Sequence, residues 1–327
     1  MNEENGVVTF KTLYRNHEYD KKEKPLREYW HYTSVDGLKG IIKEKDTDKI
    51  RFWFTRCDCL NDASEGIHVS DLFRRICIKL LYEKIIDENF YNWIIDIKIP
   101  DEQYIHYPVS PRQDCNNYSM MECIPCDAYI CSFSLKKDSL DMWRYYSKGN
   151  GGYAIKFYYN IFKHYETYCI DDYDENREFG CIQYLRVIYD TKEKEEIVEK
   201  IIKDTFLASK NSENPEKETK NFIRYVLKFL QFKFKHECFS SEEEYRFIFY
   251  LPKEKPKNLT NKMPKVEYRS QNGMLIPYIE LSAKRYISEV MTSPYNSSEI
   301  ILKTTKDYLV SCGIDCKVYP SELPVRF

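Results

Sequence analysis

The sequence predicts an α+β fold with a mixed, largely antiparallel sheet and helical insertions. Three observations support this class. Strand-like segments are interleaved with helical ones along the 327 residues, and several strands follow one another through tight turns. The third observation is that no glycine-rich phosphate loop opens a helix, because Gly149-Asn150-Gly151-Gly152 precedes a strand instead.

Composition predicts one large domain after a short polar arm. Residues 1–25 are mostly charged and polar, so we expect them to be loosely held. Residues 26–327 are long enough to form a single elaborated α+β domain. Long stretches with helical periodicity predict helical insertions at about 66–98 and 192–235.

The elements of the first third follow from composition and spacing. Residues 27–32 have strand composition, and Ser34 is placed to cap a helix whose apolar residues recur at helical spacing. A second strand is expected over 51–55, and a long helix covers 72–86. Prolines and scattered polar residues over 99–124 predict an irregular loop.

The remaining elements alternate in the same way. A helix is expected over 138–147, and Pro215 lies where the helical region 192–234 breaks in two. Further strands are expected over 127–135, 153–157, 182–189, 245–250 and 278–281. The chain then ends in a strand, a helix and a strand, over 286–292, 297–309 and 315–319.

Charge and hydropathy exclude some classes of protein. The 50 Lys and Arg residues nearly balance the 52 Asp and Glu residues, and the net charge of −2 attracts neither nucleic acid nor an anionic membrane. The sequence has no run of about 18 apolar residues and no signal peptide, so we expect a cytoplasmic protein without a membrane partner. Its 12 cysteines are irregularly spaced, as is typical of reduced thiols.

Three distant segments combine polar and aromatic residues on predicted strands. They are Trp30-His31-Tyr32-Thr33-Ser34, Cys131-Ser132-Phe133-Ser134 and Glu242-Glu243-Glu244-Tyr245-Arg246. Strands that only fill a core do not need these polar side chains, so the segments are interpreted as parts of one site assembled by folding.

The same segments belong to a series of motifs that covers roughly residues 28 to 250. The motifs are His31-Tyr32-Thr33-Ser34, Phe52-Trp53-Phe54-Thr55, Leu60-Asn61-Asp62-Ala63-Ser64-Glu65, Ser132-Phe133-Ser134 with Met142-Trp143, and Phe239-Ser240-Ser241-Glu242-Glu243-Glu244-Tyr245-Arg246. In their order and spacing the chain resembles a mainly bacterial family, domain-of-unknown-function family 2971. Ala63 replaces the usual proline, and Phe239 replaces the usual tryptophan.

A more distant resemblance is to the ADP-ribosyltransferase superfamily, which implies that NAD is the substrate and the sheet is split. By this resemblance His31 holds the adenosine ribose or phosphate end of NAD. Trp143 or Tyr146 stacks on nicotinamide, and Glu244 or Glu242 bonds the nicotinamide ribose. The resemblance implies an ADP-ribosyltransferase or NAD glycohydrolase with a toxin-like or phage-defence role.

The same hypothesis gives supporting roles to the remaining candidate residues. Tyr32 and Thr33 continue the first strand, and Ser132 and Ser134 share one face of theirs. Asn61 and Asp62 are expected to orient substrate or the His31 strand, and Arg246 to pair with a carboxylate. Each of these residues could equally have an ordinary structural role, in a sheet, at a helix cap or in the hydrophobic core.

Two other classes of function remain open. A non-catalytic nucleotide-sensing or interaction module would use the same residues to line a pocket, whereas a metal-dependent nuclease would use Asp62, Glu65 and the glutamates. Cys123 and Cys126 have metal-ligand spacing but no second pair, so no metal is expected. The sequence leaves open the acceptor of ADP-ribose (protein or nucleic acid), a homo-oligomer and an inhibitory partner.

Overall fold

A computed structural model describes most of the chain, and its described residues form two compact units. The described residues are 8–18, 28–42, 49–60, 67–99, 103–108, 121–147, 151–158, 161–162, 181–255, 263–271, 273–295 and 298–324. Residues 1–24, 62–101 and 186–240 make up one unit, here called the helical unit, and residues 25–61, 102–185 and 241–327 make up the sheet unit.

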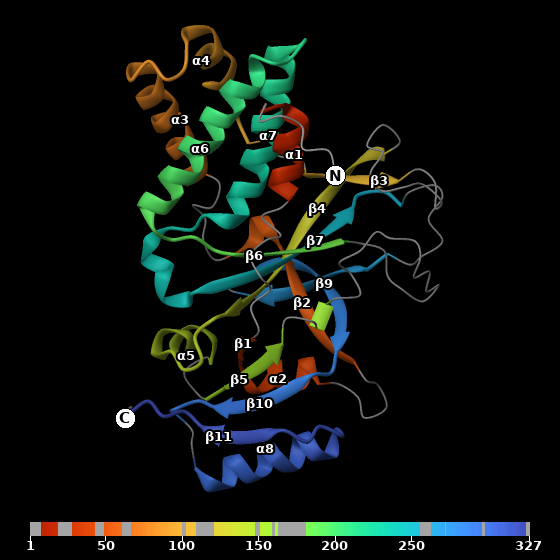
Figure 1. Cartoon of the computed structure of the whole chain (residues 1–327). Helices are drawn as coiled ribbons and strands as arrows, with labels where there is room; N and C mark the ends of the chain where they lie inside the picture. The colour runs from red at the N-terminus through yellow and green to blue at the C-terminus, as the bar shows by residue number, and fades with distance from the viewer. Residues whose placement is uncertain are drawn as a thin grey trace, which may run out of the picture. The chain divides into compact units, whose positions relative to one another are not determined.

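The described strands form one 11-stranded sheet, most of it in the order β11-β10-β5-β1-β4-β2-β9-β8, while β3 and β7 also pair with β4, and β6 pairs with β7 (Figure 1). Where the register is defined, β10 and β11 are parallel and the other pairs are antiparallel. The predicted class, α+β with a mixed and largely antiparallel sheet, is confirmed. The strands are β1 (Glu28–Thr33), β2 (Lys49–Arg56), β3 (Gln103–Pro108), β4 (Met121–Ser134), β5 (Tyr153–Tyr158), β6 (Cys181–Arg186), β7 (Glu244–Pro252), β8 (Val266–Gln271), β9 (Met274–Lys284), β10 (Ile287–Thr292) and β11 (Lys317–Pro320).

The sheet forks at β4, the longest strand. One edge of β4 pairs with β7 from Cys126 to Ser134. Its other edge pairs in turn with β3, with β2 at Tyr129 and Ile130, and with β1 at Ser134. Because β1 and β2 meet β4 at different points, the sheet continues as two branches, β1-β5-β10-β11 and β2-β9-β8.

The two faces of the central strands differ in chemistry, because successive side chains of a strand point to opposite faces. Phe133 of β4 pairs with Tyr245 of β7, and both belong to a large buried aromatic cluster. We call this the aromatic face. Ser134 pairs with Glu244 and Ser132 with Arg246 on the opposite side, which we call the polar face.

Three of the described helices belong to the sheet unit. They are α2 (Val35–Ile41), α5 (Leu140–Tyr146) and α8 (Glu299–Ser311). The hydroxyl of Ser34 accepts a hydrogen bond from the backbone N–H of Gly37 at 3.2 Å, so the predicted cap of α2 is confirmed. The described residues also include the 3₁₀ turns η2 (Cys57–Cys59) and η6 (Glu237–Glu242).

The helical unit has its own hydrophobic core. It contains α1 (Phe10–Glu18), α3 (Ile67–Tyr82), α4 (Glu88–Ile94), α6 (Thr191–Ser209) and α7 (Pro215–Lys233), which lie together in Figure 1. Leu80, Ile202 and Leu227 come from three of these helices and are completely buried in the same cluster. None of the helices in the described part of the chain is long and apolar enough to span a bilayer.

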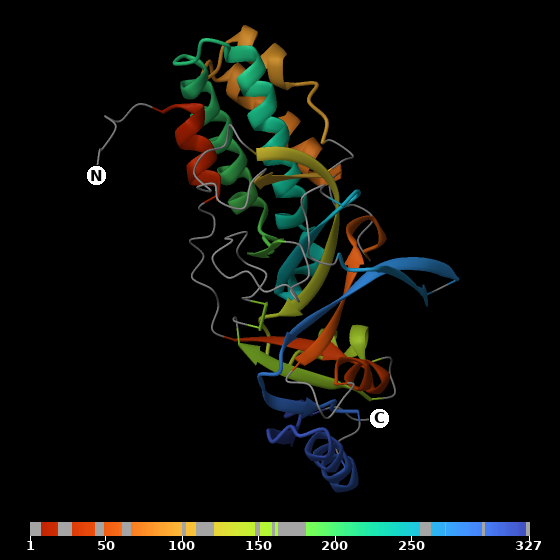
Figure 2. The ribbon, with the colours of Figure 1, turned by 90° about the vertical axis from the view of Figure 1, so that its right-hand side faces the viewer.

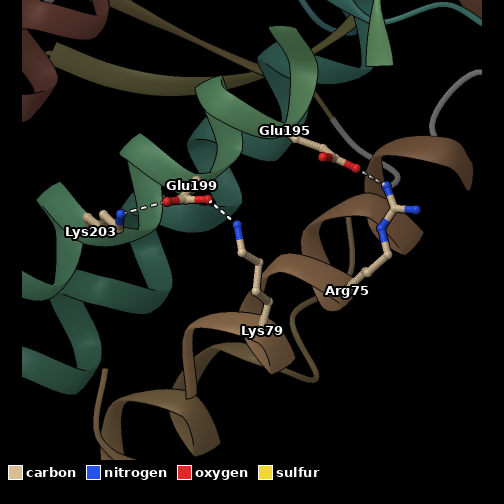
Figure 3. A network of polar contacts seen from close by, with 5 residues as sticks. All are labelled: Arg75, Lys79, Glu195, Glu199 and Lys203. Atoms are coloured by element: carbon tan, nitrogen blue, oxygen red, sulfur yellow. Dashed lines mark hydrogen bonds and ion pairs between the residues drawn. The ribbon is translucent and has the colours of Figure 1, made fainter. Parts of the chain in front are cut away.

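An ion-pair network lies on the surface between α3 and α6 (Figure 3). Glu199 accepts hydrogen bonds from Lys79 at 2.8 Å and from Lys203 at 2.6 Å, and Arg75 pairs with Glu195 at 2.7 Å. These bonds lower the pKa of the Glu199 carboxyl. The side chains are half-exposed, so each pair stabilises the helix contact only weakly.

Three elements were not predicted. The loop expected over 99–124 is wrong in part, since it contains β3 and the start of β4, which pair with each other. The sequence analysis also placed no element at α1 or β8, whereas α4 lies within the predicted helical insertion 66–98. Each of these depends on distant partners: in α1, for example, Phe10 packs against Phe222 of α7, with ring centroids 6.1 Å apart.

Candidate functional site

The three predicted segments lie on neighbouring strands. Trp30 of β1 pairs with Ser134 of β4, which pairs on its other edge with Glu244 of β7. One step along, Ser132 pairs with Arg246. Residues more than two hundred positions apart in the sequence are therefore separated by two strand spacings.

Two carboxylates and a guanidinium are buried at the start of β7. The exposed fraction is 7% for Glu242, 5% for Glu244 and 1% for Arg246. Arg246 Nη2 donates to Glu244 Oε2 at 2.9 Å, a charge-assisted hydrogen bond in a place with little water. This pairing matches the prediction that Arg246 binds a carboxylate.

Helix α5 adds a phenol to these groups. Burial raises the pKa of Tyr146 far above its ordinary value, and the negative charges of Glu242 and Glu244 raise it further, while Arg246 opposes them. The phenol therefore lies within electrostatic range of all three groups and stays protonated. We call Tyr146, Glu242, Glu244 and Arg246 the carboxylate cluster.

The backbone turns sharply between the two glutamates. Glu242 ends η6 and Glu244 begins β7, and the residue between them, Glu243, has a φ of +40°. A left-handed conformation costs a non-glycine residue about 1 kcal/mol, and such residues occur often at functional sites. Glu243 itself is exposed, and its carboxylate lies 3.5 Å from Lys136 Nζ.

Ser134 holds this turn in place. Its hydroxyl, fully buried, donates to the carbonyl oxygen of Glu242 at 2.6 Å and accepts from the backbone N–H of Lys136 at 3.1 Å. It therefore positions Glu242 through the backbone. Ser132 is half-buried on the same face, beside Arg246.

His31 does not join the carboxylate cluster. Its ring contacts Phe52 and Phe133, with centroids 5.4 and 5.1 Å away, and lies on the aromatic face, opposite to Glu244. Its Nδ1 lies 3.3 Å from the carbonyl oxygen of Ser132, which can only accept, so Nδ1 carries the hydrogen. Burial lowers the pKa of His31 to about 4, so the ring is neutral at pH 7. The imidazole and the carboxylates, which the sequence analysis placed in one site, therefore lie on opposite faces of the sheet.

Tyr32 and Trp143 fasten α5 to the sheet. The two rings meet edge to face with centroids 4.9 Å apart, and Trp143 is completely buried. Tyr32 Oη donates to the carbonyl of Lys136 at 3.0 Å and accepts from the N–H of Ser139 at 3.1 Å. Of Trp143 and Tyr146, it is Tyr146 whose pKa is raised by the charges of Glu242 and Glu244.

The structure adds one residue that the sequence analysis missed. Asp138 accepts hydrogen bonds from Trp143 Nε1 at 2.6 Å, from Ser321 Oγ at 2.8 Å and from the N–H of Glu322 at 2.9 Å. It links α5 to the segment after β11. An acidic residue at the start of the helix predicted over 138–147 is the signal that could have indicated it, since such residues often bond the helix start.

Several predicted residues have other outcomes. Thr33 ends β1 and is half-buried. Asn61, Asp62 and Glu65 lie outside the described residues. Cys126 is buried, and no group of three or more described His, Cys, Asp and Glu side chains is placed to hold a metal ion.

A surface groove of about 560 Å³ lies in the helical unit. It contains none of the candidate residues. Its lining residues are Trp93, Glu213, Asn214, Pro215, Glu216, Lys217, Lys220, Asn221 and Arg224.

Fold and site define an α+β protein with a forked, largely antiparallel sheet and a buried carboxylate cluster. The family described as Protein of unknown function (DUF2971) matches residues 142–247, which supports membership in that family. The match spans α5 to β7 and includes the four residues of the carboxylate cluster. No curated protein and no solved structure matches the chain.

Proposed function

We propose that this protein transfers or hydrolyses the ADP-ribosyl group of NAD, with Glu242 and Glu244 as its catalytic carboxylates. The observation that carries the proposal is the burial of both carboxylates beside Tyr146, where little water screens their charge. The forked sheet adds support, because the resemblance to ADP-ribosyltransferases implies a split sheet.

The chemistry needs such carboxylates. The bond between C1′ of the ribose and the nicotinamide nitrogen breaks, and the electron pair leaves with nicotinamide. C1′ becomes cation-like, and water or an acceptor nucleophile then adds to it and gives up a proton. A carboxylate in a dry site stabilises the developing positive charge, and a second one can receive the proton. The residues leave open which glutamate has which task.

The other residues have supporting roles in this proposal. Arg246 fixes the orientation of Glu244 through their 2.9 Å hydrogen bond, and Ser134 fixes the backbone of Glu242. The phenol of Tyr146 donates to a ligand or carboxylate oxygen. His31 acts from the opposite face as a neutral positioning group bonded to the Ser132 carbonyl.

The biological setting is proposed from the same chemistry. The activity would consume the cytoplasmic NAD pool, in keeping with a toxin or phage-defence effector. A protein or a nucleic acid would be the acceptor in the transferase case, and water in the glycohydrolase case.

The test is nicotinamide release from NAD by the purified full-length chain, compared for E242Q, E244Q and E243Q. E243Q is the matched control, because Glu243 belongs to the same triplet and is exposed. We expect at least one of E242Q and E244Q to lose about 100-fold or more of the rate, and E243Q to keep it. A wild-type chain that releases no nicotinamide, or E242Q and E244Q variants that both turn over at the wild-type rate, would reject the proposal.

A non-catalytic nucleotide sensor is the second candidate. The observation that favours it is the Glu244–Arg246 ion pair, which is buried and joins two side chains of the protein itself, as a structural brace would. Calorimetry with NAD, ADP-ribose and cyclic nucleotides distinguishes the two candidates. Binding without turnover supports the sensor.

A further inference from the structure

The β8–β9 hairpin ends the sheet with an open edge and exposed apolar side chains. Within the described residues β8 pairs with β9 alone, and it is the last strand of its branch. Figure 2 shows the hairpin in blue at the right, with its tip away from the other strands. Tyr268 is 63% exposed, Met274 60% and Leu275 73%. Open edges with apolar side chains are where sheets pair with other chains.

The register shows which backbone groups of β8 face the open edge. In an antiparallel pair, opposed residues either exchange both hydrogen bonds or direct their N–H and C=O groups away from each other. Tyr268 lies opposite Pro277, which has no N–H, so this pair belongs to the second kind.

The turn between β8 and β9 indicates the same orientation of the β8 backbone groups. Two residues, Asn272 and Gly273, separate Gln271 from Met274, and Gly273 has a φ of +77°. The residues that close a two-residue hairpin exchange both hydrogen bonds. Counting back from Gln271, the residues Val266, Tyr268 and Ser270 direct their N–H and C=O groups to the open edge.

The charges along β8 are self-complementary about Tyr268. Glu267 and Arg269 flank Tyr268, so an antiparallel copy centred on Tyr268 places each Glu267 opposite the other copy's Arg269. These would be non-hydrogen-bonded pairs, in which the Cα atoms are about 4.5 Å apart and side chains are closest. Opposite charges at such positions stabilise the pairing, whereas like charges destabilise it.

Arg269 is held over β2 by its own chain, so the pair with Glu267 of a second copy requires its guanidinium to turn back toward β8. Its guanidinium lies over Trp53, 5.5 Å from the ring centroid, and donates to Thr55 Oγ1 at 2.8 Å. It is half-buried, and its Nε is buried and has no hydrogen-bond partner among the described residues. No ion pair within the described part of the chain joins it to an acid, and burial lowers its pKa.

We propose that a second copy of this chain pairs with β8 in antiparallel register centred on Tyr268. Tyr268 would exchange two hydrogen bonds with its equivalent, and the two Val266–Ser270 pairs would add two each. Two Glu267–Arg269 pairs flank the axis, and the interface is isologous, as in most homodimers. Because each strand contributes only six residues, we expect a weak dimer that depends on concentration.

The first test is the mass of the full-length chain in solution, measured by light scattering over a roughly hundredfold range of concentration. The wild type should approach twice its 39.5 kDa at the upper end. S270P removes the backbone N–H that residue 270 directs to the open edge. It leaves the hydrogen bonds between β8 and β9 intact, so we expect the dissociation constant of the dimer to rise at least about tenfold. S270A keeps the N–H and should dimerise like the wild type.

The second test locates the axis. Y268C should form disulfide-linked dimers under mild oxidation, because directly opposed Cα atoms are about 5.5 Å apart. L275C is the control: Leu275 is exposed on β9, one strand further from the axis. The wild type has the exposed Cys238, so its own disulfide cross-linking under the same oxidation is the background to be subtracted.

Three results would overturn the proposal: a wild type that stays monomeric throughout, an S270P variant that dimerises as the wild type does, or a Y268C variant that cross-links no more than L275C. If S270P fails to fold, as judged by its thermal unfolding, the Y268C result decides.

Discussion

At the scale of single residues, His31 shows how burial changes what a side chain can do. A histidine with an ordinary pKa is half-protonated near pH 6.5, but the pKa of His31 is lowered to about 4 by burial. The hydrogen bond from Nδ1 to the Ser132 carbonyl is available to the neutral ring as well as to the charged one. His31 is therefore a fixed donor rather than a proton carrier at neutral pH.

The lowered pKa predicts an acid-dependent loss of stability. The unfolded state binds a proton at His31 below pH 6.5 and the folded state only below about pH 4, so stability falls as the pH drops through this window. The full effect is at most about 3 kcal/mol, because the pKa differs by about 2.5 between the two states and the residue is only partly buried. We expect the free energy of urea unfolding of the wild type to fall relative to that of H31N between pH 7 and pH 4.

In H31N the amide nitrogen can replace Nδ1 as the donor, but the side chain does not titrate. The variant should be less stable than the wild type at pH 7, since it loses ring contacts with Phe52 and Phe133. Only the pH dependence of the difference tests the burial of His31. Parallel stability curves for the two proteins would contradict it.

The residues of the carboxylate cluster were predicted from sequence, but their arrangement was not. Glu242, Glu244 and Arg246 are unusual for a buried strand, and that composition is visible in the sequence. Which face His31 occupies depends on the register between β1 and β4, and a shift of one residue would reverse it. The left-handed φ of Glu243 is also set by the surrounding bonds, because glutamate has no preference for that conformation.

At the scale of elements, Gly152 allows β5 to begin where it does. A Cβ at this position would lie 2.6 Å from the carbonyl oxygen of Thr33 and 2.7 Å from the Cβ of Ser147. Strand β5 therefore passes β1 and the end of α5 at a distance that only glycine permits.

We predict that G152A destabilises the protein by roughly 1–3 kcal/mol, because the methyl group must displace backbone atoms. G40A is the matched control: Gly40 lies in α2, and a Cβ there meets nothing within 4 Å. Alanine should stabilise that helix by about 0.5–1 kcal/mol. Urea unfolding of the two variants measures both effects, and equal stabilities would mean that the start of β5 has room to shift.

Elements with local signals were predicted, and those that depend on partners were not. Helices α3, α6 and α7 have long apolar periodicity, and Pro215 begins α7 as expected. Strand β8 is mostly polar and exposed, so its sequence alone resembles a loop. Its pairing with β9 makes it a strand, and that pairing is not visible in a propensity pattern.

At the scale of the whole molecule, two compact units have separate cores. The helical unit collects three stretches of chain, two of which contain the predicted helical insertions 66–98 and 192–235. Its buried residues form a cluster distinct from the aromatic cluster of the sheet unit. Stability is therefore expected to differ between the units.

We predict that L227A acts mainly on the helical unit. Leu227 is completely buried in the core of that unit, and removing its side chain should cost about 2–5 kcal/mol. Hydrogen exchange followed by mass spectrometry should show faster exchange in α6 and α7, with little change in β4 and β7. Equal acceleration in both units would indicate that the chain unfolds as one cooperative whole.

The hydrogen bonds of Asp138 have a practical consequence for shortened versions of the protein. Ser321 and Glu322 hold Asp138, which in turn bonds Trp143 on the helix that carries Tyr146. A fragment that stops at Pro320 would retain every described strand but lose the hydrogen bonds from Ser321 and Glu322 to Asp138. Anyone trimming the chain for crystallisation should therefore keep at least Glu322, or the phenol beside the two acids will lose its anchorage.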